Sequence, residues 1–590
     1  MSWSNRILGD RAGRSIGMSE YNADVVIVGG GISGCIMAWK LASSGVNVLV
    51  LEAGDRIDRN KSIMAYMNDP NRSNDTPYPQ VANAPFPSMD NPNDYYVQMG
   101  PDNFQSNYVK ALGGTTWHWL GTCLRFVPND FRMKSAYGVM VDWPITYNDL
   151  ESWYSLAEST LPVSGNSEFD LGAPRSQPYM MSEIPMTYSD KIIQKAFENL
   201  TLPDDPSMKL EVRGTPQGRN SKEYDNRPGC CGSNNCIPMC PVGAKYDGSV
   251  HAAKAEQAGA KILTNTTATF IQTNEDAQVT GIRFKTPEGE GVATGKIYVL
   301  AAHAIETPKL MLMSKDERYP NGVGNSSDQV GRNLMDHNCV LSYGLTKDPV
   351  FPYRAPLSTA GVENVKDGAF RKNRAAFRIE IGNDGWSWPV GYPEVLAPWM
   401  LKKSGRTYNK NAPVGQETKE TYSPDEQSKD FFYGKNFRNM IKQNVEREIR
   451  FAFLVEQPPD PNNRIVPDFE KLDSFGLPRP KIYYSIDDYT KAGINVAVDL
   501  QKKMLDSLNA TQQHHSWPYG AGHIVGTTRM GSDPKTSVVD ADLRCHDHKN
   551  MFILGSNTFP TVAASNPTLT IVAMTLKCVD AVQKQLQGME

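Results

Sequence analysis

The sequence lacks any run of 18 or more apolar residues, so it predicts no helix that spans a membrane. It also lacks a strong excess of one charge: 61 basic and 65 acidic residues leave a formal net charge of −4, which argues against nucleic acid as a partner. The first 18 residues contain neither the apolar segment of a secretory signal nor the adjacent arginines of a twin-arginine leader. These absences alone predict a cytoplasmic protein, with residues 1–20 as a flexible extension.

The sequence also lacks internal repeats. Its 590 residues suffice for several structural units, and the stretch at residues 24–52 is the one around which the others are organised. In this stretch an apolar run at 25–28 leads into Gly29, Gly31 and Gly34, which have G-x-G-x-x-G spacing, and a helical stretch then leads to a second apolar run. The pattern predicts a strand–helix–strand unit that binds a dinucleotide. Gly29 would permit the tight turn, Gly31 would let the backbone approach a pyrophosphate, and Gly34 would let the helix pack on the strand.

Glu52 ends the second apolar run, 18 residues after Gly34. A carboxylate at this position accepts hydrogen bonds from the ribose hydroxyls of the adenosine, and it argues against a 2′-phosphate. The motif by itself leaves FAD and NAD as alternative cofactors.

Beyond this unit, irregular and regular segments alternate. Residues 60–105 are rich in Asn, Asp and Pro, which predicts a long covering loop with little regular structure. Apolar alternation predicts strands at 267–272, 279–285 and 296–301, and the last of these would extend the dinucleotide-binding sheet.

The predicted domain division begins with the extension at 1–20. The dinucleotide-binding domain has three parts, at 21–135, 249–344 and 516–590. The substrate domain has a helical and cysteine-rich region at 136–248 and a second region at 345–515, with a polar insertion near 402–429.

Cysteine is sparse, with nine in 590 residues, but four of the nine lie together at Cys230, Cys231, Cys236 and Cys240. Such clustering predicts a metal or redox centre. Four thiolates suffice for a tetrahedral zinc ion, although the loop lacks the paired C-x-x-C of zinc ribbons. An iron–sulfur cluster is the other candidate, since thiolates at such spacing hold clusters.

Several motifs in the same order resemble the glucose-methanol-choline (GMC) flavoprotein oxidoreductases. They are the glycine motif with Glu52, GGTTWHW at 113–119, AIETPKLMLMS at 304–314, and the phrases GHIVGTTRMG, GSNTFP and SNPTLTI between 522 and 571. The phrases NDFRMKSAYG, CCGSNNCIPMCPVGAKYDG, NSSDQVGRNLMDH and SVVDADLR are similar to one subgroup, the FAD subunits of bacterial membrane-associated glucose, fructose and sorbitol dehydrogenases.

This resemblance implies an α/β fold in which a discontinuous Rossmann-like FAD-binding domain joins a substrate domain with a mainly antiparallel sheet, the GMC or p-hydroxybenzoate hydroxylase-like architecture. It also implies FAD as the cofactor, which we expect to be bound noncovalently. The glycine motif and the resemblance together select as cofactor-binding residues Gly29, Gly31, Ser33, Gly34, Glu52, Gly114, Thr115, His118, Gly555, Ser556 and Thr568.

The family's catalytic pair matches His523, through the H-x-x-G-T phrase, and Asn566, through the N-P-T-L-T phrase. The resemblance implies that His523 is the general base for the hydroxyl proton, and imidazole suits this role because it titrates near the working pH. Asn566 would donate a hydrogen bond to the substrate oxygen. A histidine beside glycines is more often structural, so only the family match selects His523 among nine histidines.

The subgroup resemblance further implies a [3Fe-4S] cluster held by Cys230, Cys236 and Cys240. Cys231 would stand aside, and a four-ligand cluster that includes it is the alternative. A one-electron relay implies a dehydrogenase that passes electrons to another protein. The implied partners are a small export or chaperone subunit that carries the leader and a membrane-anchored multihaem cytochrome c, and the implied location is the periplasmic face of the bacterial inner membrane.

The expected reaction is oxidation of a sugar hydroxyl or hemiacetal, with D-glucose at C1 as the first candidate and fructose, sorbitol, gluconate or glycosides as alternatives. Two readings of other classes stay open: an FAD and iron–sulfur electron-transfer subunit without its own substrate, and an oxygen-using oxidase with zinc at the cysteine loop. The chain departs from the family at His303, where a small residue is usual, and from the subgroup in the 402–429 insertion.

Overall fold

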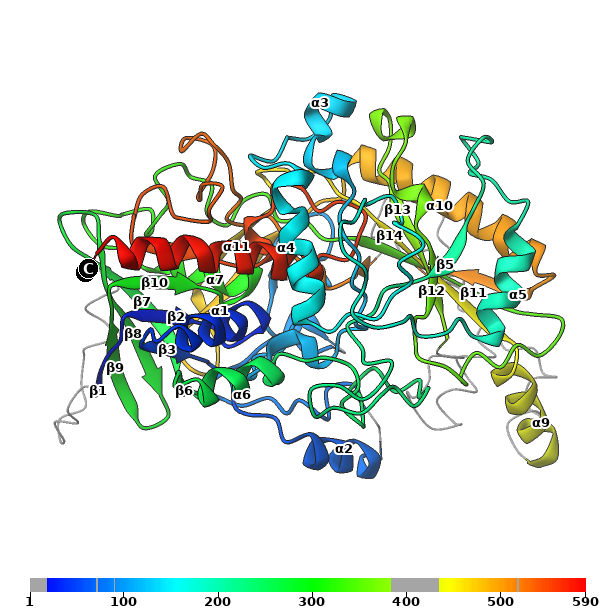
Figure 1. Ribbon diagram of the computed structural model, residues 1–590, viewed down its shortest axis with the longest axis horizontal. Helices are drawn as coiled ribbons and strands as arrows, with labels where there is room; N and C mark the ends of the chain where they lie inside the picture. The colour runs from blue at the N-terminus through cyan, green and yellow to red at the C-terminus, as the bar shows by residue number, and fades with distance from the viewer. Residues whose placement is uncertain (1–18, 71–72, 90, 384–433, 517–518, 590) are drawn as a thin grey trace.

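The computed structural model describes residues 19–70, 73–89, 91–383, 434–516 and 519–589 (Figure 1). The predicted insertion at 402–429 lies outside the described residues, as does the predicted extension up to residue 18. The last two residues of that extension belong to a strand, β1 (Ser19–Asn22).

A parallel sheet of five strands in the order β19-β10-β2-β3-β6 carries the glycine motif. Its central strands are buried along their whole length, because continuous runs of Val, Ile and Leu suit a sheet that is covered on both faces. The strands come from three distant parts of the chain, which confirms a discontinuous, Rossmann-like sheet. They are β2 (Val25–Val28), β3 (Val48–Leu51), β6 (Lys261–Leu263), β10 (Ile297–Leu300) and β19 (Met551–Ile553).

Helices lie side by side along this sheet. The helix of the glycine motif, α1 (Ile32–Ser43), contacts α6 (Ser249–Gln257) and α11 (Thr568–Gln587), and α11 also contacts α4 (Tyr147–Thr160). Figure 1 shows α11 in red alongside α1 in blue. The last helix of the chain therefore packs on the first.

The second large sheet is antiparallel and has seven strands, in the order β17-β11-β14-β13-β12-β5 with β18 beside β11. Helix α10 (Asp488–Ser507) packs on β11 and β14. This confirms the expected mainly antiparallel second sheet. The strands are β5 (Val212–Gly214), β11 (Asn338–Leu345), β12 (Ala360–Val362), β13 (Phe377–Gly382), β14 (Glu448–Val455), β17 (Thr511–His515) and β18 (Tyr519–Gly520).

Two smaller sheets complete the described strands. One has the order β1-β9-β8-β7 and the other the order β15-β16-β4. Their strands, besides β1, are β4 (Val97–Gln98), β7 (Thr267–Thr273), β8 (Val279–Thr286), β9 (Gly289–Thr294), β15 (Arg464–Leu472) and β16 (Pro478–Tyr483). The other helices are α2 (Arg59–Asn68), α3 (Met133–Tyr137), α5 (Tyr188–Phe197), α7 (His303–Met313) and α9 (Gly434–Val445), and the 3₁₀ turns are η2 (Pro92–Asp94), η3 (Gly114–Trp117), η4 (Pro128–Phe131), η5 (Asn364–Lys366), η6 (Ala369–Lys372) and η8 (Ser556–Thr558).

Helix α2 corrects the expectation of an irregular segment at 60–105. Asp58 caps the helix by accepting the N–H of Lys61 at 3.1 Å, and no residue of α2 is buried. An exposed helix shows no apolar periodicity, so the pattern that usually reveals a helix is missing here. No helix among the described residues is both long and apolar enough to cross a membrane.

Candidate active site

A cavity of about 660 Å³ lies between the carboxyl ends of the parallel strands and one face of the antiparallel sheet. Val28, Leu51 and Ala301 line it from the parallel sheet, and Leu341 and Leu454 line it from β11 and β14. Ligands of α/β sheets bind at this end of the strands. The cavity is therefore the place to test the predicted site residues.

The glycine motif has the geometry that a dinucleotide requires. A Cβ on Gly29, whose φ is +104°, would lie 2.5 Å from the carbonyl oxygen of Ala301, and a Cβ on Gly34 would lie 2.0 Å from the carbonyl oxygen of Gly29. A Cβ on Gly31 would meet no heavy atom within 4 Å, and Gly31 lines the cavity together with Ser33 at the start of α1. The backbone is therefore open toward the cavity where a pyrophosphate would lie, at the positive end of a helix dipole.

Glu52 lies at the end of β3 and lines the cavity. Its carboxylate accepts the backbone N–H of Gly30 at 2.6 Å and that of Gly54 at 2.8 Å. Burial raises the pKa of this carboxyl group, and the two N–H groups oppose the rise. Each carboxylate oxygen keeps a lone pair for another donor, as contact with ribose hydroxyls requires.

A buried ion cluster that the sequence did not reveal adjoins Glu52. Glu306 pairs with Lys110 at 3.3 Å and with Lys309 at 2.9 Å, and all three line the cavity. Within the cluster two ammonium groups face one carboxylate, and the remaining positive charge balances the neighbouring carboxylate of Glu52.

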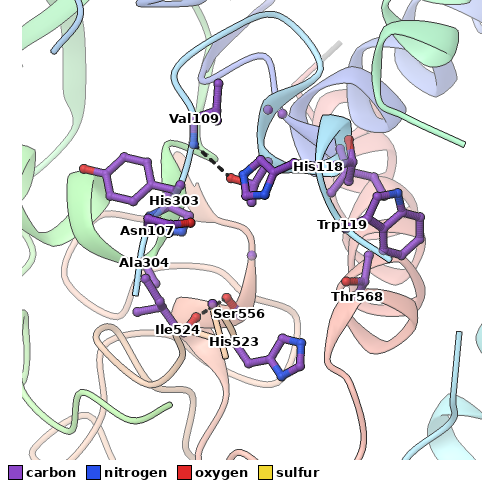
Figure 2. Close-up of a pocket in the computed structure, with 18 of the residues that line it drawn as sticks. Asn107, Val109, His118, Trp119, His303, Ala304, His523, Ile524, Ser556 and Thr568 are labelled. Carbon is purple, nitrogen blue, oxygen red and sulfur yellow. Dashed lines mark hydrogen bonds between the residues drawn. The ribbon is translucent and has the colours of Figure 1, made fainter. Parts of the chain in front are cut away.

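The predicted flavin segment lies along the same cavity, where Gly114, Thr115 and His118 all line it. The Thr115 hydroxyl accepts the N–H of Val109 at 3.4 Å, and Figure 2 shows the His118 ring beside this contact. His118 Nε2 is buried and has no hydrogen-bond partner among the described residues. Burial and the charge of Lys245 lower the pKa of His118 to about 3, so this imidazole is neutral and keeps an unused polar atom at the cavity.

His303, the departure from the family pattern, also lines the cavity (Figure 2). It has a φ of +76°, a left-handed conformation that only glycine adopts without strain, and its ring stacks on Tyr108 at 4.1 Å between centroids. Burial lowers its pKa to about 4. The small residue usual in the family is thus replaced by a neutral, stacked imidazole.

The C-terminal segment supplies the remaining predicted residues. Gly555, Ser556 and Thr568 line the cavity, and the Ser556 hydroxyl donates to the carbonyl oxygen of Ile524 at 2.6 Å (Figure 2). Thr568 is the first residue of α11, so a second helix N-terminus adjoins the cavity. Of the predicted cofactor residues only Gly34 is not part of the lining, because it packs α1 against the turn.

The predicted catalytic pair meets at the same cavity. His523, in the loop after β18, and Asn566, just before α11, are separated by 43 residues in the chain, yet the Asn566 amide nitrogen lies 3.3 Å from His523 Nε2. Figure 2 shows the His523 ring at the cavity below Ser556. Burial, and then the neighbouring His337 and Arg378, lower the pKa of His523 well below its usual value, so the imidazole is neutral and able to accept a proton.

Two side chains that the sequence did not single out hold this pair. His337 Nδ1 lies 2.7 Å from His523 Nδ1, and Arg378 Nη1 donates to the Asn566 side-chain oxygen at 2.7 Å. Arg378 is itself buried and pairs with Glu363 at 2.8 Å and with Glu380 at 3.1 Å. His337 is the last residue of the phrase NSSDQVGRNLMDH, and this phrase was its only signal in the sequence. Arg378 lies in a buried strand, and no pattern in the sequence pointed to it.

The cysteine loop lies next to the cavity. Ile237 lines the cavity, and its neighbour Cys236 accepts a hydrogen bond on Sγ from Arg219 at 3.0 Å. Lys245 donates to the carbonyl oxygen of Cys236 at 2.8 Å and to that of Trp117 at 3.0 Å, and so connects the loop with the flavin segment.

The thiols of the loop are free but differ in exposure. Cys236 and Cys240 are buried, Cys230 is half-buried and Cys231 is exposed. Burial raises the pKa of Cys230, and nearby Cys236 and Cys240 raise it further, which places these thiols close to one another. Among the described residues no group of three or more His, Cys, Asp or Glu side chains is placed to hold a metal ion. Four free thiols are a donor set that fits the chemistry of an iron–sulfur cluster as well as that of a zinc ion.

Comparison with known proteins identifies the class. Residues 23–339 match the N-terminal part of the GMC oxidoreductase family and residues 468–575 match its C-terminal part. The chain belongs to the GMC oxidoreductase family and is an FAD-dependent oxidoreductase.

Relatives and solved structures agree with this assignment. The chain is 34% identical to the fructose dehydrogenase large subunit of Gluconobacter japonicus over 96% of this chain and 98% of that protein. It is 23% identical to the gluconate 2-dehydrogenase flavoprotein of Pantoea cypripedii over 95% of this chain and 94% of that protein. The crystal structure of pyridoxine 4-oxidase from Mesorbium loti has the same fold, with a TM-score of 0.61 at 16% identity over 95% of this chain and 99% of that one. The resemblance to sugar dehydrogenase flavoproteins is thus confirmed.

Proposed function

We propose that this chain is the catalytic FAD subunit of a sugar dehydrogenase, which oxidises a hydroxyl or hemiacetal of a sugar. The observation that carries the proposal is the contact between His523 and Asn566 at a cavity that suits FAD. D-Glucose at C1 and D-fructose are the first substrates to test, the first from the sequence motifs and the second because a relative over nearly the whole chain is a fructose dehydrogenase subunit.

FAD, when bound, supplies the acceptor for a hydride from the substrate carbon. The protein's part is to hold the substrate and move its proton. His523 Nε2 accepts the hydroxyl proton, which it can do because the imidazole is neutral. The Asn566 amide, held by Arg378, donates to the substrate oxygen and orients it.

The part of the cavity lined by the antiparallel sheet supports a sugar as substrate. Leu341, Tyr343 and Leu454 give it an apolar surface, and the Glu380 carboxylate lies among them at the cavity. An apolar surface suits the C–H face of a sugar ring, and a carboxylate accepts hydrogen bonds from its hydroxyls.

We propose further that Cys230, Cys236 and Cys240 hold a [3Fe-4S] cluster; the exposed Cys231 stands aside, and a four-ligand cluster that includes it is the alternative. The loop adjoins the cavity through Ile237, so electrons would have a short route from FAD. They would then leave for a membrane-anchored multihaem cytochrome c, and a small subunit would assist export to the periplasmic face of the membrane.

Electron paramagnetic resonance and absorption spectra of anaerobically purified protein test both proposals. We expect a near-isotropic signal of oxidised three-iron clusters, and flavin bands that bleach on addition of glucose or fructose. Cys236→Ser should abolish the iron signal, whereas the matched Cys231→Ser should keep it. Loss of the signal in Cys231→Ser as well would favour a four-ligand cluster, and properly loaded protein without iron would contradict the relay.

A further inference from the structure

His337 is fully buried between the predicted base and a backbone carbonyl group. Its Nε2 lies 2.8 Å from the carbonyl oxygen of Ala563, and its Nδ1 lies 2.7 Å from Nδ1 of His523. The two rings are nearly perpendicular, at 87°. Both nitrogens of His337 are therefore engaged, one by a group that can only accept and one by the base itself.

The carbonyl oxygen of Ala563 fixes where the protons lie in this chain of contacts. A carbonyl accepts but never donates, so His337 Nε2 must carry a hydrogen. Burial lowers the pKa of His337 to about 4, so the ring is neutral and its Nδ1 is an acceptor. His523 Nδ1 must then carry the hydrogen between the two rings, so His523 Nε2 carries none and is an acceptor.

The other contacts of His523 agree with this arrangement. Arg378 donates to the side-chain oxygen of Asn566, which turns the amide nitrogen toward His523 Nε2 at 3.3 Å. That N–H group needs an acceptor, and Nε2 without a hydrogen provides one. The backbone N–H of His523 donates to Asp336 at 2.9 Å, and this contact holds the loop without involving the ring.

We infer that His337 is a positioning residue that sets the tautomer of His523, so that Nε2 faces the substrate ready to accept its hydroxyl proton. The inference rests on the proposed function, in which His523 is the base. His337 does not touch the substrate or FAD in this account; it acts only through His523, as a carboxylate orients the imidazole in other acid–base sites.

The experiment compares flavin reduction by sugar in wild type, His337→Leu, His337→Asn and His523→Ala by anaerobic stopped-flow absorption. Leu removes the acceptor, so we expect the rate constant to fall by about 10²-fold or more, with KM changed less than about threefold and FAD content unchanged. Asn places an oxygen near the position of Nδ1, so the rate constant of His337→Asn should be at least about tenfold higher than that of His337→Leu. Normal reduction in His337→Leu, with His523→Ala inactive, would overturn the inference but keep the proposed base. Normal reduction in His523→Ala would overturn the base as well.

A second measurement determines the tautomers in the wild-type protein, and uses a variant for assignment. Protein labelled with ¹⁵N-histidine, with His523 assigned by its loss in His523→Ala, reports by NMR which ring nitrogen carries the hydrogen. We expect the hydrogen on Nδ1 of His523 and on Nε2 of His337 near neutral pH. A hydrogen on Nε2 of His523 would contradict the inference whatever the rates.

Discussion

The two ends of the cavity are built in different ways. The nucleotide end consists of Gly29, Gly31, Gly34 and Glu52, which lie within one strand–helix–strand unit and act through backbone geometry and one carboxylate. The end that holds the proposed catalytic pair, called the catalytic end below, consists of His337, Arg378, His523 and Asn566, which come from four separate places in the chain and are joined by side-chain hydrogen bonds.

The two ends should therefore respond differently to substitutions. At Gly29 and Gly34 an added side chain would collide with backbone, so a substitution there should displace the turn and release the cofactor, whereas Gly31 leaves open space on the cavity side. At the catalytic end each side chain orients the next, so a substitution should leave the cofactor in place and slow the reaction.

Gly29→Ala should abolish FAD binding, because the added Cβ would lie 2.5 Å from the carbonyl oxygen of Ala301. The matched control is Gly45→Ala, at a glycine of similar φ, +87°, with no heavy atom within 4 Å of the added Cβ. The control should cost about 1–2 kcal/mol of stability and keep its FAD. Flavin absorbance of the purified proteins measures the outcome, and a normal FAD content in Gly29→Ala would break the contrast.

Arg378→Met should lower the free energy of unfolding by about 3–5 kcal/mol, because it removes the arginine from the buried Glu380 and leaves the buried Glu363 with Lys366 at 3.5 Å. Lys502→Met removes a pair with Asp506, in which the two side chains are 66% and 50% exposed, and should cost less than about 1 kcal/mol. Urea unfolding of both variants tests this. Equal costs would show that the ion pairs of the catalytic end do not stabilise the fold.

Asn566→Ala should slow flavin reduction by about 10²-fold while FAD stays bound, because the substrate oxygen loses a donor that is already oriented. Asn22→Ala, on an exposed strand, serves as a control for the purification and assay. Stopped-flow absorption gives the rate and the flavin spectrum gives the FAD content. Loss of FAD in Asn566→Ala would mean that the two ends are not separable.

The smallest expected effect is that of pH. Burial and the neighbouring His337 and Arg378 keep the pKa of His523 well below its usual value, so the base stays unprotonated between pH 6 and pH 8. Its activity is lost only as the pH falls through that lowered pKa. Asp336, whose pKa burial raises to about 7, is the one carboxyl group bonded to the His523 backbone among the described residues. Asp336→Asn removes the carboxyl group whose pKa lies within this range. The flavin reduction rate of this variant should therefore vary less than about threefold between pH 6 and pH 8, and a tenfold fall toward pH 6 would contradict the proposed base.

The nucleotide end could be predicted from the sequence because its residues are close in the chain and each glycine has a steric reason. Ser33 and Glu52 were found in the same way, and both line the cavity. The strands around the motif were also predicted, since continuous apolar runs mark a buried parallel sheet. Helix α2 was missed because none of its residues is fully buried; Ile63 packs against the core only as a partly buried side chain.

The catalytic end could not be derived from residues alone. His523 and Asn566 were selected by resemblance to a family, and their contact across 43 residues has no local signal. Arg378 is one charged residue in a buried strand, and its role depends on pairing with residues far along the chain. Such positions become visible only when the fold brings their donors and acceptors together.

We propose that the catalytic end oxidises a sugar with His523 as the base. Anaerobic flavin absorption after mixing with glucose or fructose, in wild type and in His523→Ala, tests it most directly. We predict that sugar bleaches the flavin of wild type and that His523→Ala, with equal FAD content, bleaches about 10²- to 10⁴-fold more slowly. Equal bleaching in both proteins, or a wild-type flavin that dithionite bleaches but no sugar does, would contradict the account.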